Sequence, residues 1–183
     1  MNSPVVLVLA SGRGERFLAS GGSGNKLHAL LGDKTVLEHT VAAARASGLP
    51  VHVEDAGHEG MGDSIAAAVR ATRDAGGWLV LPGDLPLVRA DSLRAVANAL
   101  AHSTVVLPHY RGQRGHPVGF AGVCRTALML LEGAQGAAQV VRAYAQSGRI
   151  ANLELDDPGI VTDVDTLADL RRAQRLHADA SAR

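Results

Sequence analysis

Short apolar runs alternate with alanine-rich, helix-patterned segments over almost the whole chain. Residues 5–10, "VVLVLA", are continuous, rich in β-branched side chains and followed by a glycine-containing loop, a pattern typical of a strand buried on both faces. Residues 35–47 then place apolar side chains at helical spacing and stop at Gly48. Repetition of this order predicts an α/β fold with a mostly parallel sheet and helices on both faces.

The same patterns give the bounds of the expected elements. The expected strands span residues 5–10, 51–55, 77–84, 104–110, 116–122, 149–155 and 159–165. The expected helices span residues 35–47, 63–75, 91–102, 123–132, 137–147 and 166–180. The chain contains no evident repeat or linker, and 183 residues suit one domain, so residues 1–183 are expected to form a single domain.

Composition and charge narrow the class of partner. Aromatic residues make up only 3% of the chain, so the core must come from Val, Leu, Ile and Ala. Eighteen basic residues balance 18 acidic ones without a block of like charge, which argues against binding to nucleic acid or a membrane surface. No apolar run approaches membrane-spanning length, and the first one is too short for a signal peptide. We therefore expect a cytoplasmic protein with a small-molecule partner.

The loop after the first expected strand carries the most unusual chemistry. Gly12 and Gly14 allow backbone N–H groups to face an anion, and Arg13, Arg16 and Lys26 supply cationic donors. A polyphosphate is the ligand that this combination suits, whereas the alternative is a flexible glycine-rich surface loop.

Two common phosphate motifs do not fit this loop. The dinucleotide fingerprint G-x-G-x-x-G fails because Phe17 occupies its third glycine position. The phosphate-loop signature fails because Lys26 lies between Asn25 and Leu27. A dinucleotide-dependent dehydrogenase is therefore disfavoured.

Five motifs in order carry a family resemblance. They are "LASGRGERF…NKL", "GMGDSIAAAV", "LPGDLPLV", "RGQRGHPVGF" and "DVDTLADL". The chain resembles the nucleotidyltransferases of molybdenum-cofactor maturation, especially the molybdenum cofactor cytidylyltransferase group and its guanylyltransferase relatives. The resemblance implies a Rossmann-like nucleotidyltransferase fold and Mg²⁺-dependent transfer from CTP, or less readily GTP, to the phosphate of a molybdopterin-type cofactor. Pyrophosphate would be released, and a molybdoenzyme or its chaperone is a candidate partner.

The resemblance also implies roles for individual residues. Arg16, Lys26 and Asp84 would be catalytic, and Arg114 and His116 would bind the acceptor. The residues expected to bind the nucleotide are Ala10, Ser11, Gly12, Arg13, Gly14, Gly60, Met61 and Ser64. For Gly60 to Ser64, helix capping by Gly62 or Asp63 is the alternative explanation. For His116, the alternative is a structural turn before Pro117.

The resemblance also implies that Asp84 is a metal ligand, and Asp163 and Asp165 are the candidates for the second carboxylate. Mg²⁺ prefers hard oxygen ligands and is usually held by one or two carboxylates together with substrate phosphates. Asp163 and Asp165 would share a face of an extended strand, and Asp163 is the preferred second ligand. Asp165 could instead cap the last helix.

Other functions remain open from the sequence. The acceptor could be another phosphorylated small molecule, such as a sugar or polyol phosphate, because a fold does not fix a function. A short segment over residues 48–61, together with Ala134 and Ala138 where the family usually has Asp and Arg, also allows a non-catalytic nucleotide- or cofactor-binding carrier.

Overall fold

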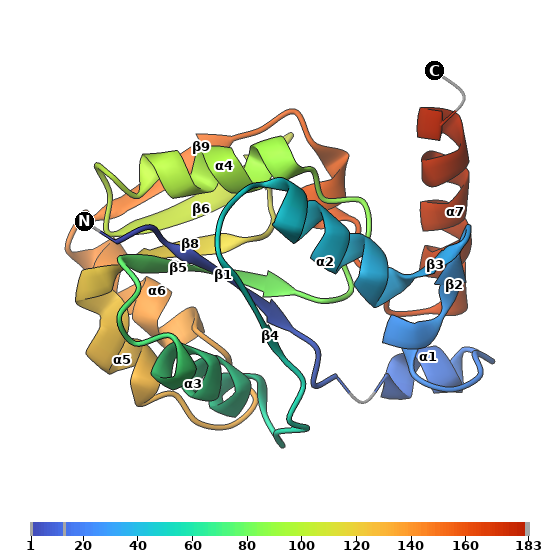
Figure 1. Ribbon diagram of the computed structural model, residues 1–183, viewed down its shortest axis with the longest axis horizontal. Coiled ribbons are helices and arrows are strands. Elements are labelled where there is room, and N and C mark those ends of the chain that lie inside the picture. The colour runs from blue at the N-terminus through green and yellow to red at the C-terminus, as the bar shows by residue number, and fades with distance from the viewer. Residues whose placement is uncertain (1, 13, 182–183) are drawn as a thin grey trace.

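A seven-stranded sheet forms the centre of the computed structural model, which describes residues 2–12 and 14–181. Its strand order is β4-β1-β5-β8-β6-β7, and β9 also pairs with β6 (Figure 1). The strands are β1 (Val5–Leu9), β4 (Val51–Glu54), β5 (Gly77–Pro82), β6 (Val105–Tyr110), β7 (Gln113–Arg114), β8 (Val118–Ala121) and β9 (Ile150–Glu154). β4, β1, β5, β6 and β9 run in one direction, whereas β8 and β7 run in the other. The prediction of a mostly parallel α/β sheet is confirmed.

Alternation along the strands divides the core into two layers. On β1, Leu7 and Leu9 face a cluster that includes residues of α3 (Met61–Ala71), α5 (Arg125–Met129) and α6 (Ala138–Gln146). Val6 and Val8 face the other cluster, which includes residues of α2 (Val36–Ala46) and α4 (Ala90–Ala99). Figure 1 shows these two sets of helices on opposite faces of the sheet. Because both faces are covered, the strand is apolar throughout, as its sequence indicated.

A smaller third cluster lies beyond the sheet. It joins α1 (Glu15–Ala19), the 3-10 helix η1 (Lys26–His28), the hairpin of β2 (Leu30–Leu31) with β3 (Lys34–Thr35), and α7 (Leu167–Ser181). Phe17 is buried here, at 2% exposure, and anchors α1. Figure 1 shows α7 beside this hairpin and away from the main layers. This cluster fixes the two ends of the glycine-rich loop.

Several expected element bounds are wrong. The loop after β1 contains α1, α3 ends at Ala71 rather than residue 75, and only Arg125–Met129 of the expected helix 123–132 is α-helical, after the 3-10 helix η2 (Gly122–Cys124). The C-cap of α3 is Thr72, whose Oγ1 accepts a hydrogen bond from Trp78 Nε1 at 3.0 Å. That bond ties the end of the helix to the start of β5.

The expected strand over residues 159–165 is also wrong. Pro158–Val161 instead forms the 3-10 helix η3, because the Asp157 side chain accepts a hydrogen bond from Gly159 N and Pro158 favours a first helical turn. A Cβ on Gly159 would lie 2.0 Å from the Leu87 carbonyl oxygen, so this turn packs tightly against the chain after β5. The apolar alternation of the segment reflects burial of Ile160 and Val164 in two different clusters.

Across residues 2–12 and 14–181, the structure contains no helix with the length and apolar character needed to span a membrane.

Candidate active site

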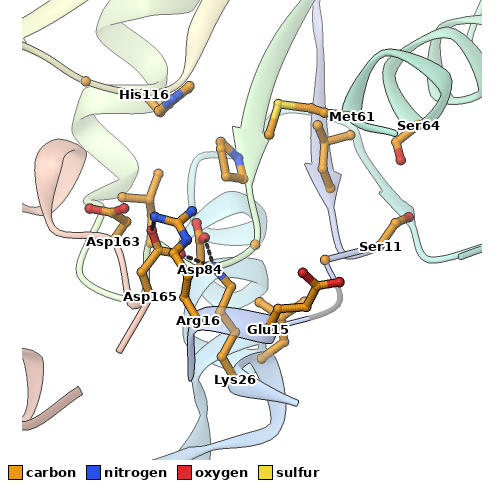
Figure 2. A pocket seen from close by; sticks show the side chains of 18 of the residues that line it. Ser11, Glu15, Arg16, Lys26, Met61, Ser64, Asp84, His116, Asp163 and Asp165 are labelled. Carbon is orange, nitrogen blue, oxygen red and sulfur yellow. Dashed lines mark hydrogen bonds and ion pairs between the residues drawn. The ribbon is translucent and has the colours of Figure 1, made fainter. Parts of the chain in front are cut away.

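A pocket of about 580 Å³ opens beside the carboxyl ends of β1 and β5. Its volume lies within the range of sites that hold small ligands. Most of the predicted site residues line the pocket: Ser11, Gly12, Gly14, Arg16, Lys26, Gly60, Met61, Ser64, Asp84, Arg114, His116, Asp163 and Asp165. Figure 2 shows side chains from the opposite sides of this pocket facing one another.

Among the described residues, Ala10 is the predicted site residue that does not line the pocket. Ala10 packs against the third cluster, and its backbone N–H donates to the Glu54 carbonyl at 2.8 Å. This bond continues the pairing of β1 with β4 and positions the loop that follows. Arg13 lies outside the described residues.

Lys26 is the centre of an ion cluster. Its Nζ lies 2.6 Å from Asp84 Oδ2 and 2.6 Å from Asp165 Oδ1, and its side chain is only 10% exposed (Figure 2). Arg16 Nη1 lies 2.6 Å from Asp165 Oδ2, although the Arg16 side chain is 78% exposed. Two cations thus neutralise two carboxylates that come from segments 81 residues apart.

The carboxylates keep Lys26 charged. Burial alone would lower the pKa of Lys26, but attraction and hydrogen bonds from Asp84 and Asp165 raise it above its ordinary value. Lys26 is therefore an ammonium ion at neutral pH.

Asp165 is an ion-pair partner and does not cap α7. Thr166 performs that role: the backbone N–H of Asp169 donates to Thr166 Oγ1, and Asp169 Oδ2 accepts from Thr166 N at 2.8 Å. Leu167 follows as the first residue of α7. Its backbone N–H donates to Ser20 Oγ at 3.0 Å, a bond that proline could not make.

Asp163 lies on the pocket wall but has an exposed side chain, and the structure joins Asp165, not Asp163, to Asp84 through Lys26. Desolvation, followed by the charges of Asp84 and Asp165, raises the pKa of Asp163 above its ordinary value. Ionised Asp163 thus adds negative charge at the edge of the cluster.

Gly14 brings the glycine-rich loop close to Lys26. Its φ of 67° is in the left-handed region, and a Cβ there would lie 3.3 Å from the Lys26 backbone nitrogen. Asn25 Nδ2 donates to the Gly12 carbonyl at 3.0 Å and closes the loop on itself. Lys26 therefore shares one wall of the pocket with Ser11, Gly12 and Gly14.

The start of α3 combines structural and accessible groups. A Cβ on Gly60 would lie 2.3 Å from the Gly133 carbonyl oxygen, and Ser64 Oγ donates to the Gly60 carbonyl at 3.2 Å. Asp63 does not cap the helix but accepts from Gly133 N. Met61 is 48% exposed and lines the pocket, so it is the predicted residue whose side chain is free to contact a ligand here.

Arg114 and His116 enter from a hairpin. Arg111 and Gly112 both have positive φ, which makes the two-residue turn between β6 and β7. His116 lies across the pocket from the ion cluster (Figure 2), and its backbone N–H donates to the Ile160 carbonyl at 2.9 Å. Its Nδ1 is buried and lacks a hydrogen-bond partner among the described residues. Desolvation lowers the pKa of His116, so the ring is neutral at pH 7.

Sequence reasoning missed a polar cluster at the end of β4. Glu54 is 7% exposed, and its carboxylate lies 3.2 Å from His52 Nε2 and 3.1 Å from His58 Nε2. Burial alone would raise the pKa of Glu54, but hydrogen bonds from His52, the Ala56 N–H and His58 hold it below its ordinary value. His58 and the next residue, Glu59, line the pocket. The spacing His-x-Glu-x-x-x-His was the signal available in the sequence.

The donor set fits a divalent cation held jointly with a ligand. Asp84 and Asp165 each direct a carboxylate oxygen at the same atom, Lys26 Nζ. Carboxylate oxygens in such an arrangement suit Mg²⁺ or Mn²⁺. In the part of the chain that the structure describes, no group of three or more His, Cys, Asp or Glu side chains is arranged to hold a metal alone. Further oxygen ligands would have to come from water or from phosphates.

Comparisons with known proteins agree with this fold. Residues 42–149 match the family model described as the MobA-like NTP transferase domain. A phosphoenolpyruvate guanylyltransferase of Nocardia farcinica is 34% identical over 149 residues, which cover 76% of this chain. The chain spans 62% of the length of that relative.

Solved structures share the architecture. A nucleotidyl transferase from Methanothermobacter thermautotroptrophicus superposes with a TM-score of 0.82 at 22% identity, covering 98% of this chain and 100% of that one. Rv0371c of Mycobacterium tuberculosis has a TM-score of 0.76 at 24% identity, covering 95% and 98%, and is also known as a complex with manganese. The family match, which spans more than half of the residues, and the related guanylyltransferase show that the chain belongs to the MobA-like NTP transferase domain family.

Proposed function

We propose that this protein transfers a nucleotidyl group from a nucleoside triphosphate to an anionic oxygen of a small acceptor and releases pyrophosphate. The observation that carries the proposal is the ion cluster of Lys26, Arg16, Asp84 and Asp165 beside a glycine-rich loop in one pocket. A glycine-rich loop with two cations suits a triphosphate, and two carboxylates suit the metal that accompanies it.

Each residue has a physical task in this reaction. Lys26 and Arg16 bind and orient the triphosphate and stabilise the charge that develops on the leaving pyrophosphate. Asp84 and Asp165 would hold Mg²⁺, with Asp163 as a further oxygen donor at the edge. When bound, the metal would supply charge neutralisation between the phosphates. An acceptor oxygen attacks the α-phosphorus, and the bond from that phosphorus to the β-phosphate oxygen breaks as pyrophosphate leaves.

The hairpin side of the pocket would bind the acceptor. Arg114 is a cation suited to a phosphate or carboxylate, and neutral His116 can donate or accept one hydrogen bond from its ring. Two acceptors deserve the first tests. A molybdopterin-type phosphate follows from the motif resemblance, and phosphoenolpyruvate follows from the name of the N. farcinica relative.

The test is product formation by the purified protein. Each of GTP, CTP, ATP and UTP would be incubated with Mg²⁺ or Mn²⁺ and with molybdopterin or phosphoenolpyruvate, and the products would be analysed by mass spectrometry and pyrophosphate release. We expect one nucleotide and one acceptor to give a product in which they share a new phosphoanhydride bond. Tight nucleotide binding without pyrophosphate release for any acceptor would instead support the carrier alternative.

A further inference from the structure

Glu59 places an unpaired carboxylate on the wall of the pocket. The residue lies in the loop between β4 and α3 and its side chain is exposed. Among residues 2–12 and 14–181 it has no hydrogen-bond or ion-pair partner, whereas Asp84 and Asp165 are paired with cations. A carboxylate in this state offers both oxygens to a ligand.

The preceding residue is held firmly. His58 Nε2 lies 3.1 Å from Glu54 Oε1, and the Glu54 backbone carbonyl accepts from Ala10 N at 2.8 Å and Ser11 Oγ at 3.4 Å. On the other side, a Cβ on Gly60 would overlap the Gly133 backbone, so that residue is fixed by packing. Glu59 thus lies between two anchored positions, in a loop joined directly to the phosphate-binding loop.

The distribution of charge divides the pocket. Lys26 and Arg16 mark the side that suits a triphosphate, and Figure 2 shows Met61 and Ser64 across the pocket from Asp163 and Asp165. Phosphates would avoid the negative charge of Glu59, which adjoins Gly60 and Met61. The uncharged nucleoside is the part of the substrate that can approach it.

The chemistry of a free carboxylate selects among bases. Guanine presents two adjacent donors, N1–H and the N2 amino group, which match the two oxygens of one carboxylate. Cytosine and adenine present one amino donor beside a ring acceptor, and that acceptor would face a carboxylate oxygen without a proton between them. We propose that Glu59 recognises the guanine base through these two donors and makes GTP the nucleotide substrate.

This inference rests on the proposed function, and its test measures binding alone. Titration calorimetry of GTP, ITP, CTP and ATP with Mg²⁺ and no acceptor gives the order of affinity. The base of ITP lacks the N2 amino group and so isolates one of the two hydrogen bonds. We expect wild-type protein to bind GTP about tenfold more tightly than ITP, and Glu59→Gln to lose about tenfold or more for GTP with no loss for CTP.

Glu15→Gln is the matched control, because Glu15 is a second exposed carboxylate on the same pocket but lies on the phosphate-loop side. It should change the affinity for all four nucleotides in parallel. Wild-type protein that binds nucleotides without preference for GTP, or Glu59→Gln with the wild-type preference, would overturn the role of Glu59 and leave the proposed function standing. Wild-type protein that binds none of the four would overturn both.

Discussion

Replacing Lys26 with methionine tests whether its ammonium holds the place of a metal in the free protein. Methionine keeps most of the buried length of the side chain but removes the charge that pairs with Asp84 and Asp165. Each carboxylate oxygen lies 2.6 Å from Lys26 Nζ, so the two oxygens are at most twice that distance apart. At an effective dielectric constant of about 20, two unit charges about 5 Å apart repel by about 3 kcal/mol.

The repulsion sets the size of the expected effect. Asp165 keeps Arg16 as a partner, and both carboxylates are 17% exposed. Arg16 and solvent therefore reduce the repulsion between the two carboxylates. We expect Lys26→Met to lower the free energy of unfolding by about 1–3 kcal/mol without metal. We also expect Mn²⁺ to bind the nucleotide-free variant at least about tenfold more tightly than wild-type protein, and to restore stability on binding.

Two measurements check this expectation. Electron paramagnetic resonance would measure the concentration of free Mn²⁺ as protein is added without nucleotide, which gives the Mn²⁺ affinity. Urea unfolding with and without Mn²⁺ would give the free energy of unfolding. Lys34→Met is the control, because Lys34 is an exposed lysine of β3 and makes no ion pair among the described residues. If Lys26→Met binds Mn²⁺ no more tightly than wild-type protein, Lys26 does not compete with the metal and the reasoning is refuted.

Three further substitutions test the remaining parts of the site. Asp84→Asn should reduce turnover by about 100-fold or more with a much smaller change in thermal stability, as followed by pyrophosphate release and thermal melting. His116→Ala should raise the KM for the acceptor while nucleotide affinity, measured calorimetrically without acceptor, stays constant; equal losses for both in a destabilised protein would make His116 structural. Because desolvation and negative neighbours raise the pKa of Asp163, its ionisation opposes folding above that pKa. Asp163→Asn should therefore raise Tm at pH 7, and the gain should vanish as pH falls through the raised pKa towards 3.8; an unchanged gain at acid pH would contradict this cause.

The periodic elements were predictable because burial on two faces leaves a strong signal. β1 and β5 are apolar at nearly every position because successive side chains point to opposite faces of the sheet, and helices cover both faces. The stop of α2 was also visible, because Gly48 adopts a φ of 75° that other residues avoid. The apolar strands and the glycine at the end of α2 are visible in short stretches of sequence, so they could be predicted without knowing which distant residues they contact.

The irregular segments were not predictable in the same way. The alternation of residues 159–165 indicated a strand, but its apolar side chains enter separate clusters and its shape depends on Asp157 and on packing against Leu87. Which of Asp163 and Asp165 lies beside Asp84 was also not predictable, because it depends on the irregular backbone of this segment. A two-residue spacing places both on one face of a strand, whereas the actual chain turns Asp165 to Lys26 and leaves Asp163 at the edge.

The direction of β8 decides whether the motif "RGQRGHPVGF" can belong to the site at all. In a parallel sheet, residues that precede a strand lie at the edge opposite the carboxyl ends, away from Lys26 and Asp84. β8 is antiparallel to β5, with Val118 beside Val80 and Ala121 beside Gly77, so its first residue lies near the carboxyl end of β5. Arg114 and His116 therefore reach the pocket because this strand is reversed. The reversal brings the hairpin proposed to bind the acceptor and the loop proposed to bind the triphosphate to one edge of the sheet, which is the arrangement that a transfer between two bound substrates requires.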